Sequence, residues 1–282
     1  MSTCPVCRVD SIPTRITKTT TRTFSIERCR GCGLAFATPR PTEEELDAFY
    51  SDRYFKSPTG GLGYTDYRGE SWAEANAEAM WREFHDWART TPPEESVLDI
   101  GCATGGFLRR ARQAGWRVHG VEKSLAAAEV ARSEFYLPVS ATIGAVDERF
   151  GLITMWHILE HMLDPLAALQ QARELLVPGG ILFIELPQWD ALGRRKNGST
   201  WAQLRPPEHI NFFNRRSLQV ALGLVDLRIV QSATVQPNLT NRAVEMIRQG
   251  RPVSGAAVAL VTELFGRVGL GGYLRCASVS SA

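Results

Sequence analysis

Long apolar runs and an excess of either charge are both missing from this sequence. No uncharged apolar stretch approaches the roughly 18 residues that a membrane-spanning helix needs, and the segment after Met1 lacks the apolar core of a signal peptide. The 32 lysines and arginines nearly balance the 30 aspartates and glutamates, so the formal net charge is only +2. Such a small charge does not indicate nucleic acid as a partner. We therefore expect a cytoplasmic protein without membrane contact, and 44% hydrophobic residues over 282 positions suffice for one full domain with a small appendage.

Cysteine is also scarce, and four of the six cysteines form two C-x-x-C pairs near the N-terminus. Cys4 and Cys7 make the first pair, and Cys29 and Cys32 make the second. Two such pairs supply the four thiolates of a closed tetrahedral zinc site, whereas disulfides are rare in the cytoplasm. The segment 12–26, rich in Thr, Ile and Phe, predicts a hairpin that joins the pairs. We therefore predict an N-terminal zinc ribbon with a structural Zn²⁺.

An apolar run meets a glycine-rich turn at residues 96–108, which read Ser-Val-Leu-Asp-Ile-Gly-Cys-Ala-Thr-Gly-Gly-Phe-Leu. This order predicts a buried strand, a tight loop and a helix. Gly101 and Gly105 allow a positive φ and a close approach of a ligand, which the N–H groups at the helix start would face. Such a turn can bind more than one nucleotide-type cofactor. A dinucleotide is one candidate, since the turn matches a degraded Gly-x-Ala-x-x-Gly fingerprint and Glu122 stands where a ribose-binding acid is expected.

Expected strands and helices alternate from residue 96 onward, which is typical of a parallel, doubly wound α/β sheet. Strands are expected over 96–100, 117–121, 139–143, 152–155, 181–187 and 227–235, and helices over 106–113, 125–133 and 217–224. A further helix is expected to begin with Asp164 as its cap and Pro165 as its first residue. A last strand over 273–279 is expected to be antiparallel. The sequence thus predicts a Rossmann-like architecture.

Three segments resemble class I S-adenosylmethionine-dependent methyltransferases. Asp99-x-Gly101-x-Ala103-x-Gly105 resembles their first motif, with alanine at the middle glycine position. The run 150–165 contains Leu-Glu-His and resembles their fourth motif, and the Pro-Gly-Gly segment 173–187 resembles the part that follows it. A dinucleotide dehydrogenase has no reason to carry this pair of motifs in this order. The resemblance implies a mixed seven-stranded sheet and S-adenosylmethionine as the cofactor.

The resemblance also implies where the cofactor binds. The acid before the first glycine would lie beside the aminoacyl end of the cofactor, and Glu122 would bind the ribose hydroxyls. The family usually has an acid where Gly151 stands, and this departure concerns the strand entry more than the cofactor site. The implied cofactor-binding residues are Asp99, Gly101, Ala103, Gly105, Glu122, Trp156 and Tyr54.

A long, aromatic connection over residues 188–216 is expected to bind the acceptor. Its Pro-Pro-Glu-His-Ile-Asn-Phe-Phe core resembles a segment of methyltransferases that carry zinc-binding N-termini, some of which methylate nucleotide-linked sugars. By this match His161, Glu208 and His209 lie at the acceptor, while Pro206 stands close to the place of an expected tyrosine. We predict O-methylation of a small molecule, either a sugar, a nucleotide sugar or a specialised metabolite. The transfer would be an in-line displacement with His161 or His209 as the base and Glu208 orienting it.

Other functions stay open from the sequence alone. Some ribosomal RNA guanine methyltransferases also combine an N-terminal zinc site with this fold, although no basic aromatic groove is visible here. A non-catalytic module that binds the cofactor or a partner through the ribbon is a further alternative. His157, Glu160 and His161 match the H-x-x-E-H signature of zinc proteases. That chemistry needs both histidines on one helix face, whereas these residues follow an expected strand.

The remaining segments complete a four-part organisation. It consists of the zinc ribbon (1–40), a helical linker or lid (41–95), the S-adenosylmethionine-binding core (96–240), and C-terminal helices with the last strand (241–282). Thr42 and Glu45 predict a capping box at the start of the linker. The broadly apolar helix expected over 254–268 lacks a basic face, so it is a candidate lid or homo-oligomer contact.

Overall fold

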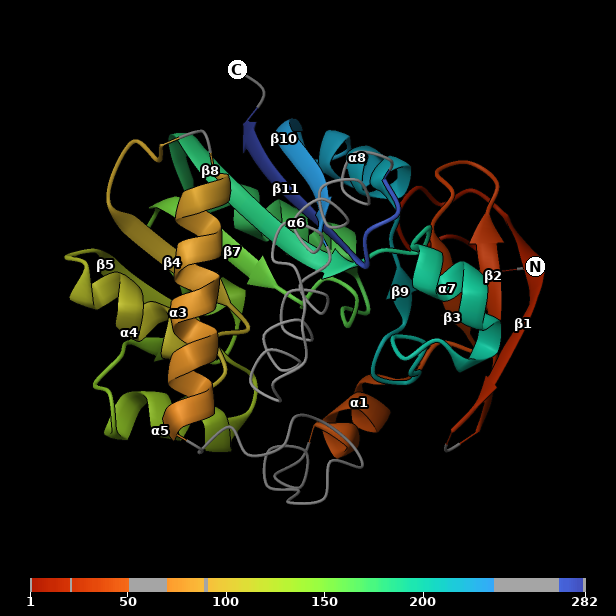
Figure 1. Ribbon diagram of the computed structural model, residues 1–282, viewed down its shortest axis with the longest axis horizontal. Helices are drawn as coiled ribbons and strands as arrows, with labels where there is room; N and C mark the ends of the chain where they lie inside the picture. The colour runs from red at the N-terminus through yellow and green to blue at the C-terminus, as the bar shows by residue number, and fades with distance from the viewer. Residues whose placement is uncertain (1, 21, 51–69, 89–90, 236–268, 281–282) are drawn as a thin grey trace, which may run out of the picture.

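A seven-stranded sheet forms the centre of the protein. The computed structural model describes residues 2–20, 22–50, 70–88, 91–235 and 269–280. The strands of this sheet are β4 (Ser96–Ile100), β5 (Arg117–Val121), β6 (Val139–Ser140), β7 (Phe150–Trp156), β8 (Leu176–Pro187), β10 (Leu227–Val235) and β11 (Tyr273–Ser280). They lie in the order β10-β11-β8-β7-β4-β5-β6, and only the pairings of β11 with its two neighbours are antiparallel (Figure 1). This confirms the predicted Rossmann-like, mixed seven-stranded α/β fold.

Helices cover both faces of the sheet. They are α3 (Glu70–Trp87), α4 (Gly106–Gln113) and α5 (Leu125–Ser133) on one face, and α6 (Pro165–Glu174) and α8 (Arg215–Gly223) on the other. Successive residues of a strand point to opposite faces, so Leu152 joins the buried cluster of α3 and α4, whereas Ile153 joins that of α6 and α8. Continuous apolar strands such as β7 follow from this two-sided burial.

Two helix starts follow their sequence signals. Thr42 caps α1 (Glu43–Phe49), and its side chain and that of Glu45 bond reciprocally to each other's backbone N–H. Asp164 caps α6 through a bond from the Ala167 N–H, with Pro165 at the first turn. The predicted capping box and the predicted start of α6 are thus confirmed.

A second, four-stranded antiparallel sheet forms the N-terminal ribbon. Its strands are β1 (Ser11–Thr19), β2 (Thr23–Cys29), β3 (Ala35–Thr38) and β9 (Asn211–Phe212), in the order β1-β2-β3-β9. The hairpin of β1 and β2 agrees with the sequence, but β9 comes from the segment expected to bind the acceptor. Phe212 packs with Phe24, Trp189 and Trp201 on one side of this sheet. The ribbon is therefore built partly from the acceptor segment.

Some expectations differ from the structure or fall outside the residues that it describes. The strand expected over 181–187 begins earlier, since β8 starts at Leu176. The acceptor segment also contains a short helix, α7 (Leu192–Asn197), which the sequence did not indicate. Within the described residues, no helix is long and apolar enough to cross a bilayer. The helix expected over 254–268 lies outside the described residues.

Candidate functional site

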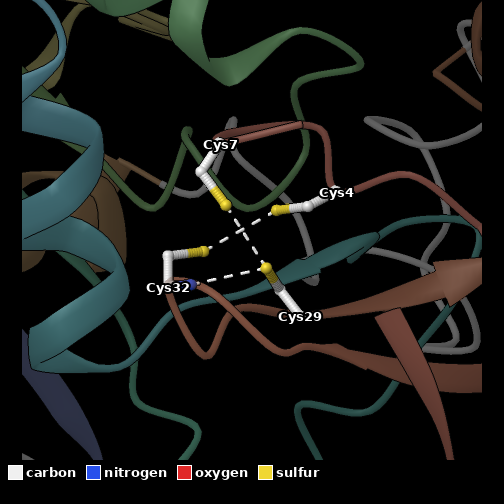
Figure 2. A group of neighbouring side chains, drawn as sticks. All are labelled: Cys4, Cys7, Cys29 and Cys32. Carbon is white, nitrogen blue, oxygen red and sulfur yellow. Dashed lines mark hydrogen bonds between the residues drawn. The ribbon is translucent and has the colours of Figure 1, made fainter. Parts of the chain in front are cut away.

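The four cysteines of the two C-x-x-C pairs converge on one point (Figure 2). The Cys4 and Cys32 sulfurs lie 3.7 Å apart, and those of Cys7 and Cys29 lie 3.3 Å apart. Around a tetrahedral ion with Zn–S bonds of about 2.3 Å, neighbouring sulfurs are about 3.8 Å apart. The N–H groups of Gly31 and Cys32 both point at the Cys29 sulfur, 3.3 and 3.4 Å away, and favour its thiolate form. The donor set and spacing therefore fit a four-thiolate zinc ion.

Arg40 connects the ribbon side of the chain to the acceptor side. Its guanidinium donates to the Leu163 carbonyl at 2.7 Å and to the Asn211 side chain at 2.8 Å. Burial lowers the pKa of Arg40 to about 10, which leaves it charged at neutral pH. A charged group with these bonds fixes the loop after β7 against the start of β9.

The glycine turn after β4 has the conformation that its sequence predicts. Gly101 and Gly105 have φ of +81° and +84°, and a Cβ on Gly101 would lie 2.0 Å from the Ile158 side chain. Ala103 also has a positive φ of 48°, a region that disfavours alanine. The Ala103 N–H donates to Glu122 Oε2 at 2.9 Å, so Glu122, just after β5, holds the turn closed. A carboxylate has about four acceptor positions, so Glu122 could still accept ribose hydroxyls.

Asp99 and Trp156 lie deeper in the same region. Asp99 in β4 is 3% exposed and accepts a bond from the Thr154 hydroxyl at 2.7 Å. Burial raises the pKa of Asp99 to about 7. Trp156 packs on Phe183 at the end of β7, and its buried indole N–H has no hydrogen-bond partner among the described residues. These polar groups and the glycine turn fit a nucleoside cofactor. Tyr54, the remaining predicted cofactor residue, lies outside the described residues.

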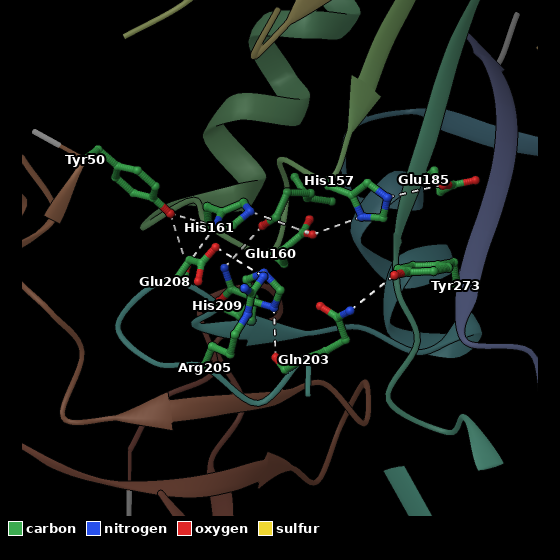
Figure 3. A network of polar contacts seen from close by, with 12 residues as sticks. Tyr50, His157, Glu160, His161, Glu185, Gln203, Arg205, Glu208, His209 and Tyr273 are labelled. Carbon is green, nitrogen blue, oxygen red and sulfur yellow. Dashed lines mark hydrogen bonds and ion pairs between the residues drawn. The ribbon is translucent and has the colours of Figure 1, made fainter. Parts of the chain in front are cut away.

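His157 joins two buried carboxylates at the carboxyl end of β7 (Figure 3). Its Nδ1 lies 3.5 Å from Glu160, and its Nε2 lies 3.3 Å from Glu185. Burial lowers the pKa of His157, but the contacts with these acids outweigh burial and raise it to about 10. Arg275 in β11 donates to Glu185 from Nε at 2.7 Å and completes this chain of charges. His157 is thus held as a cation between two acids.

His161 lies in the loop after β7 and faces the acceptor segment. Its Nδ1 is 2.8 Å from the main-chain oxygen of Glu208 and 2.7 Å from the Tyr50 hydroxyl. Because a carbonyl oxygen can only accept, Nδ1 must carry a proton, and in the neutral ring the lone pair is therefore on Nε2. That Nε2 is 3.8 Å from Glu160, and the side chain is 18% exposed. His161 therefore presents an available proton acceptor.

His209 is held in a similar way but is more enclosed. Its Nδ1 lies 2.8 Å from the Gln203 carbonyl, and its Nε2 lies 3.3 Å from the Arg205 guanidinium. Burial lowers the pKa of His209 well below its usual value, which keeps the ring neutral. The Glu208 carboxylate lies 3.2 Å from the same Arg205 guanidinium. Glu208 thus contacts His161 through its main-chain oxygen.

The structure brings together the three predicted catalytic residues, and three neighbours that the sequence did not single out for this role join them. The neighbours are Tyr50, Glu160 and Arg205. Glu160 belongs to the Leu-Glu-His run that the sequence analysis singled out. Nothing in the sequence linked Tyr50 to His161, which is 111 positions away. Its hydroxyl reaches His161 from the end of α1, a different part of the chain from Pro206. Only folding could reveal this contact.

The H-x-x-E-H residues 157–161 lie in the loop between β7 and α6 and not on a helix. Trp156 ends β7, and the next helix, α6, begins at Pro165, so His157 and His161 share no helix face. The protease alternative fails because that chemistry needs two histidines one turn apart on a helix. The predicted geometry of a strand followed by a loop is confirmed.

Comparisons with known proteins place the chain in a family. The ubiquinone biosynthesis O-methyltransferase of Histophilus somni is 34% identical over 106 residues, which cover 32% of this chain and 44% of that protein. Two solved structures share the fold. Geranyl diphosphate C-methyltransferase from Streptomyces coelicolor A3(2) has a TM-score of 0.57 and 16% identity, and the match covers 86% of this chain and 98% of that one. The cyclase SpnF has a TM-score of 0.56 and 20% identity, and the match again covers 86% of this chain and 98% of that one. The chain thus spans less than half of the curated relative's length. The model of a family described as "Methyltransferase domain" matches residues 72–232, more than half of the chain, and the chain belongs to this methyltransferase family.

Proposed function

We propose that this protein transfers a methyl group from S-adenosylmethionine to an oxygen of a small-molecule acceptor. The observation that carries the proposal is the contact between the glycine turn and the loop after β7. β4 and β7 are paired in parallel, so the segments that follow them leave the sheet at the same edge. Ile158, three positions before His161, lies so close to Gly101 that a Cβ there could not fit. The cofactor turn and the acceptor-side histidine are therefore neighbours.

The chain's own residues account for binding and alignment of the cofactor. S-adenosylmethionine supplies an electrophilic methyl group on its sulfonium, and the family membership and the glycine turn support it as the cofactor. Glu122 holds the turn and has acceptor capacity left for the ribose, and Asp99 would lie at the aminoacyl side. Aligning the methyl group with an acceptor and excluding water is the larger part of such catalysis.

His161 is the base that we favour for removing the acceptor proton. Its Nε2 carries a lone pair, and its Nδ1–H is fixed by the Glu208 carbonyl, which sets the tautomer and the ring orientation. His209 has the same tautomer, but its Nε2 already faces a donor on Arg205. His161 is also the more exposed of the two, since His209 is 3% exposed.

An oxygen acceptor is supported by the O-methyltransferase name of the curated relative and by the two histidines, since an imidazole can accept a hydroxyl proton. The aromatic acceptor segment, with Trp189, Trp201 and Phe212 packed together, suits a compact organic molecule better than a polynucleotide. A sugar, a nucleotide sugar or a specialised metabolite remains the proposed acceptor class, with cytoplasmic metabolism as its setting. The ribbon Zn²⁺ is proposed as a structural ion.

The test has two separable parts. Calorimetry with S-adenosylmethionine and its demethylated product is expected to give saturable binding to the folded protein. Transfer of a labelled methyl group is then measured with sugars, nucleotide sugars, phenolic metabolites and RNA. Absence of any cofactor binding would contradict the proposal, and transfer to RNA alone would replace the acceptor class. Tight cofactor binding without transfer to any acceptor would favour a different activity on this fold, as in the cyclase SpnF.

A further inference from the structure

A cluster of three side chains beside the cofactor region has the composition of a metal site. Glu160, His161 and His209 each offer one ligand atom, and these atoms lie within 4.8 Å of one another (Figure 3). They come from two segments, the loop after β7 and the acceptor segment. The cluster shares no residue with the four-cysteine site.

Glu160 is the most unusual member of the cluster. It is 2% exposed, and neither carboxylate oxygen accepts a hydrogen bond among the described residues. The imidazoles of His157 and His161 lie 3.5 and 3.8 Å from its carboxylate. The His157 imidazolium balances part of the Glu160 charge, and both carboxylate oxygens keep acceptor positions that a further cation could use.

The two histidines are prepared as ligands. Carbonyl oxygens of Gln203 and Glu208 each accept the Nδ1–H of one imidazole at 2.8 Å. This leaves the lone pair on Nε2 in both rings and fixes their orientation. Backbone carbonyls on the far nitrogen are the usual outer partners of metal-bound histidines.

We propose that Glu160, His161 and His209 bind a first-row divalent transition-metal ion, through one carboxylate oxygen and the two Nε2 atoms. Two imidazoles with one carboxylate form a ligand set for Zn²⁺ and its neighbours that leaves at least one position open. An oxygen atom of the methyl-acceptor molecule, such as a hydroxyl, would fill this open position.

Two local changes accompany binding. Ligand atoms around such an ion lie roughly 3–3.5 Å apart, so the widest separation in the cluster must shrink by up to roughly 1–2 Å through side-chain rotation. The Arg205 guanidinium, 3.3 Å from His209 Nε2, must also move away. Its side chain is 38% exposed, which leaves it room to do so.

The metal site and the proposed general base use the same lone pair of His161, so they belong to two different states of the protein. In the ion-loaded protein His161 Nε2 is a ligand, so the general-base role belongs to the ion-free protein. Binding of the ion needs neither the cofactor nor turnover. A failure of the metal site and a failure of the proposed methyl transfer are therefore measured separately.

The experiment compares metal content between matched variants of the full chain. Protein is dialysed to equilibrium against Zn²⁺, and zinc per chain is counted by mass spectrometry for the wild type and for E160Q, H161Q and H119Q. The Glu160 main-chain oxygen, which accepts bonds from Ile210 and Asn211, is unaffected by E160Q. His119 contacts Ser140, away from the cluster, and H119Q is the control. Circular dichroism confirms that each variant is folded.

We expect one more zinc ion per chain in the wild type and H119Q than in E160Q and H161Q, with the second ion bound at least about 10-fold more weakly once a ligand is lost. Co²⁺ added to wild type that carries one equivalent of Zn²⁺, held by the four thiolates, is expected to give weak d–d absorption without new thiolate charge-transfer absorption. Equal zinc content in the wild type and both cluster variants would overturn the proposal. New thiolate absorption as the only Co²⁺ signal would overturn it as well, because the ion would then lie at the cysteines.

Discussion

His161 donates from Nδ1 to the main-chain oxygen of Glu208 across 2.8 Å. This bond joins the loop after β7 to the acceptor segment, and it sets the tautomer of the proposed base. A backbone acceptor has a consequence for mutagenesis, because substitutions of the Glu208 side chain leave it in place.

Replacement of His161 by glutamine is expected to lower turnover by about 100-fold or more, a typical loss for a general base. Cofactor affinity should stay within about 2-fold of wild type, because His161 contacts Tyr50 and Glu208 rather than the glycine turn. Steady-state kinetics and calorimetry measure the two quantities. H119Q is the matched control, and unchanged turnover in H161Q would remove His161 as the base.

Replacement of Tyr50 by phenylalanine removes the hydroxyl 2.7 Å from His161 Nδ1 but keeps the ring. The Glu208 carbonyl still holds the imidazole, so we expect a loss of about 1 kcal/mol, or roughly 5-fold in turnover. The pH–rate profile should keep its shape. A loss as large as that in H161Q would instead place Tyr50 among the groups that touch the acceptor.

Replacement of Gly101 by alanine is expected to destabilise the protein by about 2–4 kcal/mol, through left-handed strain and overpacking together. The new Cβ would lie 2.0 Å from Ile158, at a φ of +81°. Gly115→Ala is the control, since its φ is +94° and nothing lies within 4 Å of the Cβ position. Urea unfolding measures both variants. Equal destabilisation would show that Ile158 moves aside freely.

Asp99 predicts a pH dependence of stability. Burial raises its pKa from 3.8 to about 7, so the folded state binds a proton that the unfolded state has released. Its contribution is therefore fully present below about pH 4 and is lost as the pH rises through 7. Asp99→Asn mimics the neutral acid, so the stability lost between pH 5 and pH 8 should shrink by on the order of 1–3 kcal/mol.

Urea unfolding of the wild type and Asp99→Asn at both pH values isolates this group, because all other titrations are shared. The bond from Thr154 is retained by the asparagine oxygen. An unchanged difference between the two pH values would show that Asp99 titrates at its ordinary pKa in the folded protein.

Removal of zinc from the ribbon is expected to impair methyl transfer more than cofactor binding. β3 pairs with β9 of the acceptor segment, whereas the glycine turn follows β4, which pairs with β5 in the other sheet. Chelation should lower the melting temperature by roughly 2–4 °C for each kcal/mol lost and reduce turnover, and added Zn²⁺ should restore both. Turnover that survives complete loss of zinc would separate the ribbon from the acceptor site.

Much of this protein follows from its sequence because the signals are local. The paired cysteines, the glycine turn at Gly101, the cap at Asp164 and the apolar strands each depend on neighbours a few positions away. The fold follows from them, since alternating strands and helices have few ways to pack. The resemblance carried by these segments also led to His161, Glu208 and His209 as one site, and the structure places them together.

Tertiary structure alone decided what surrounds those residues. The hydroxyl of Tyr50 on His161, the contribution of β9 to the ribbon sheet and the buried carboxylate of Glu160 all depend on segments that are distant in sequence. The same is true of the contact between the Glu208 backbone carbonyl and His161. Such contacts leave no periodicity or spacing in the chain, because they form only when packing of the sheet and the ribbon brings the loops together.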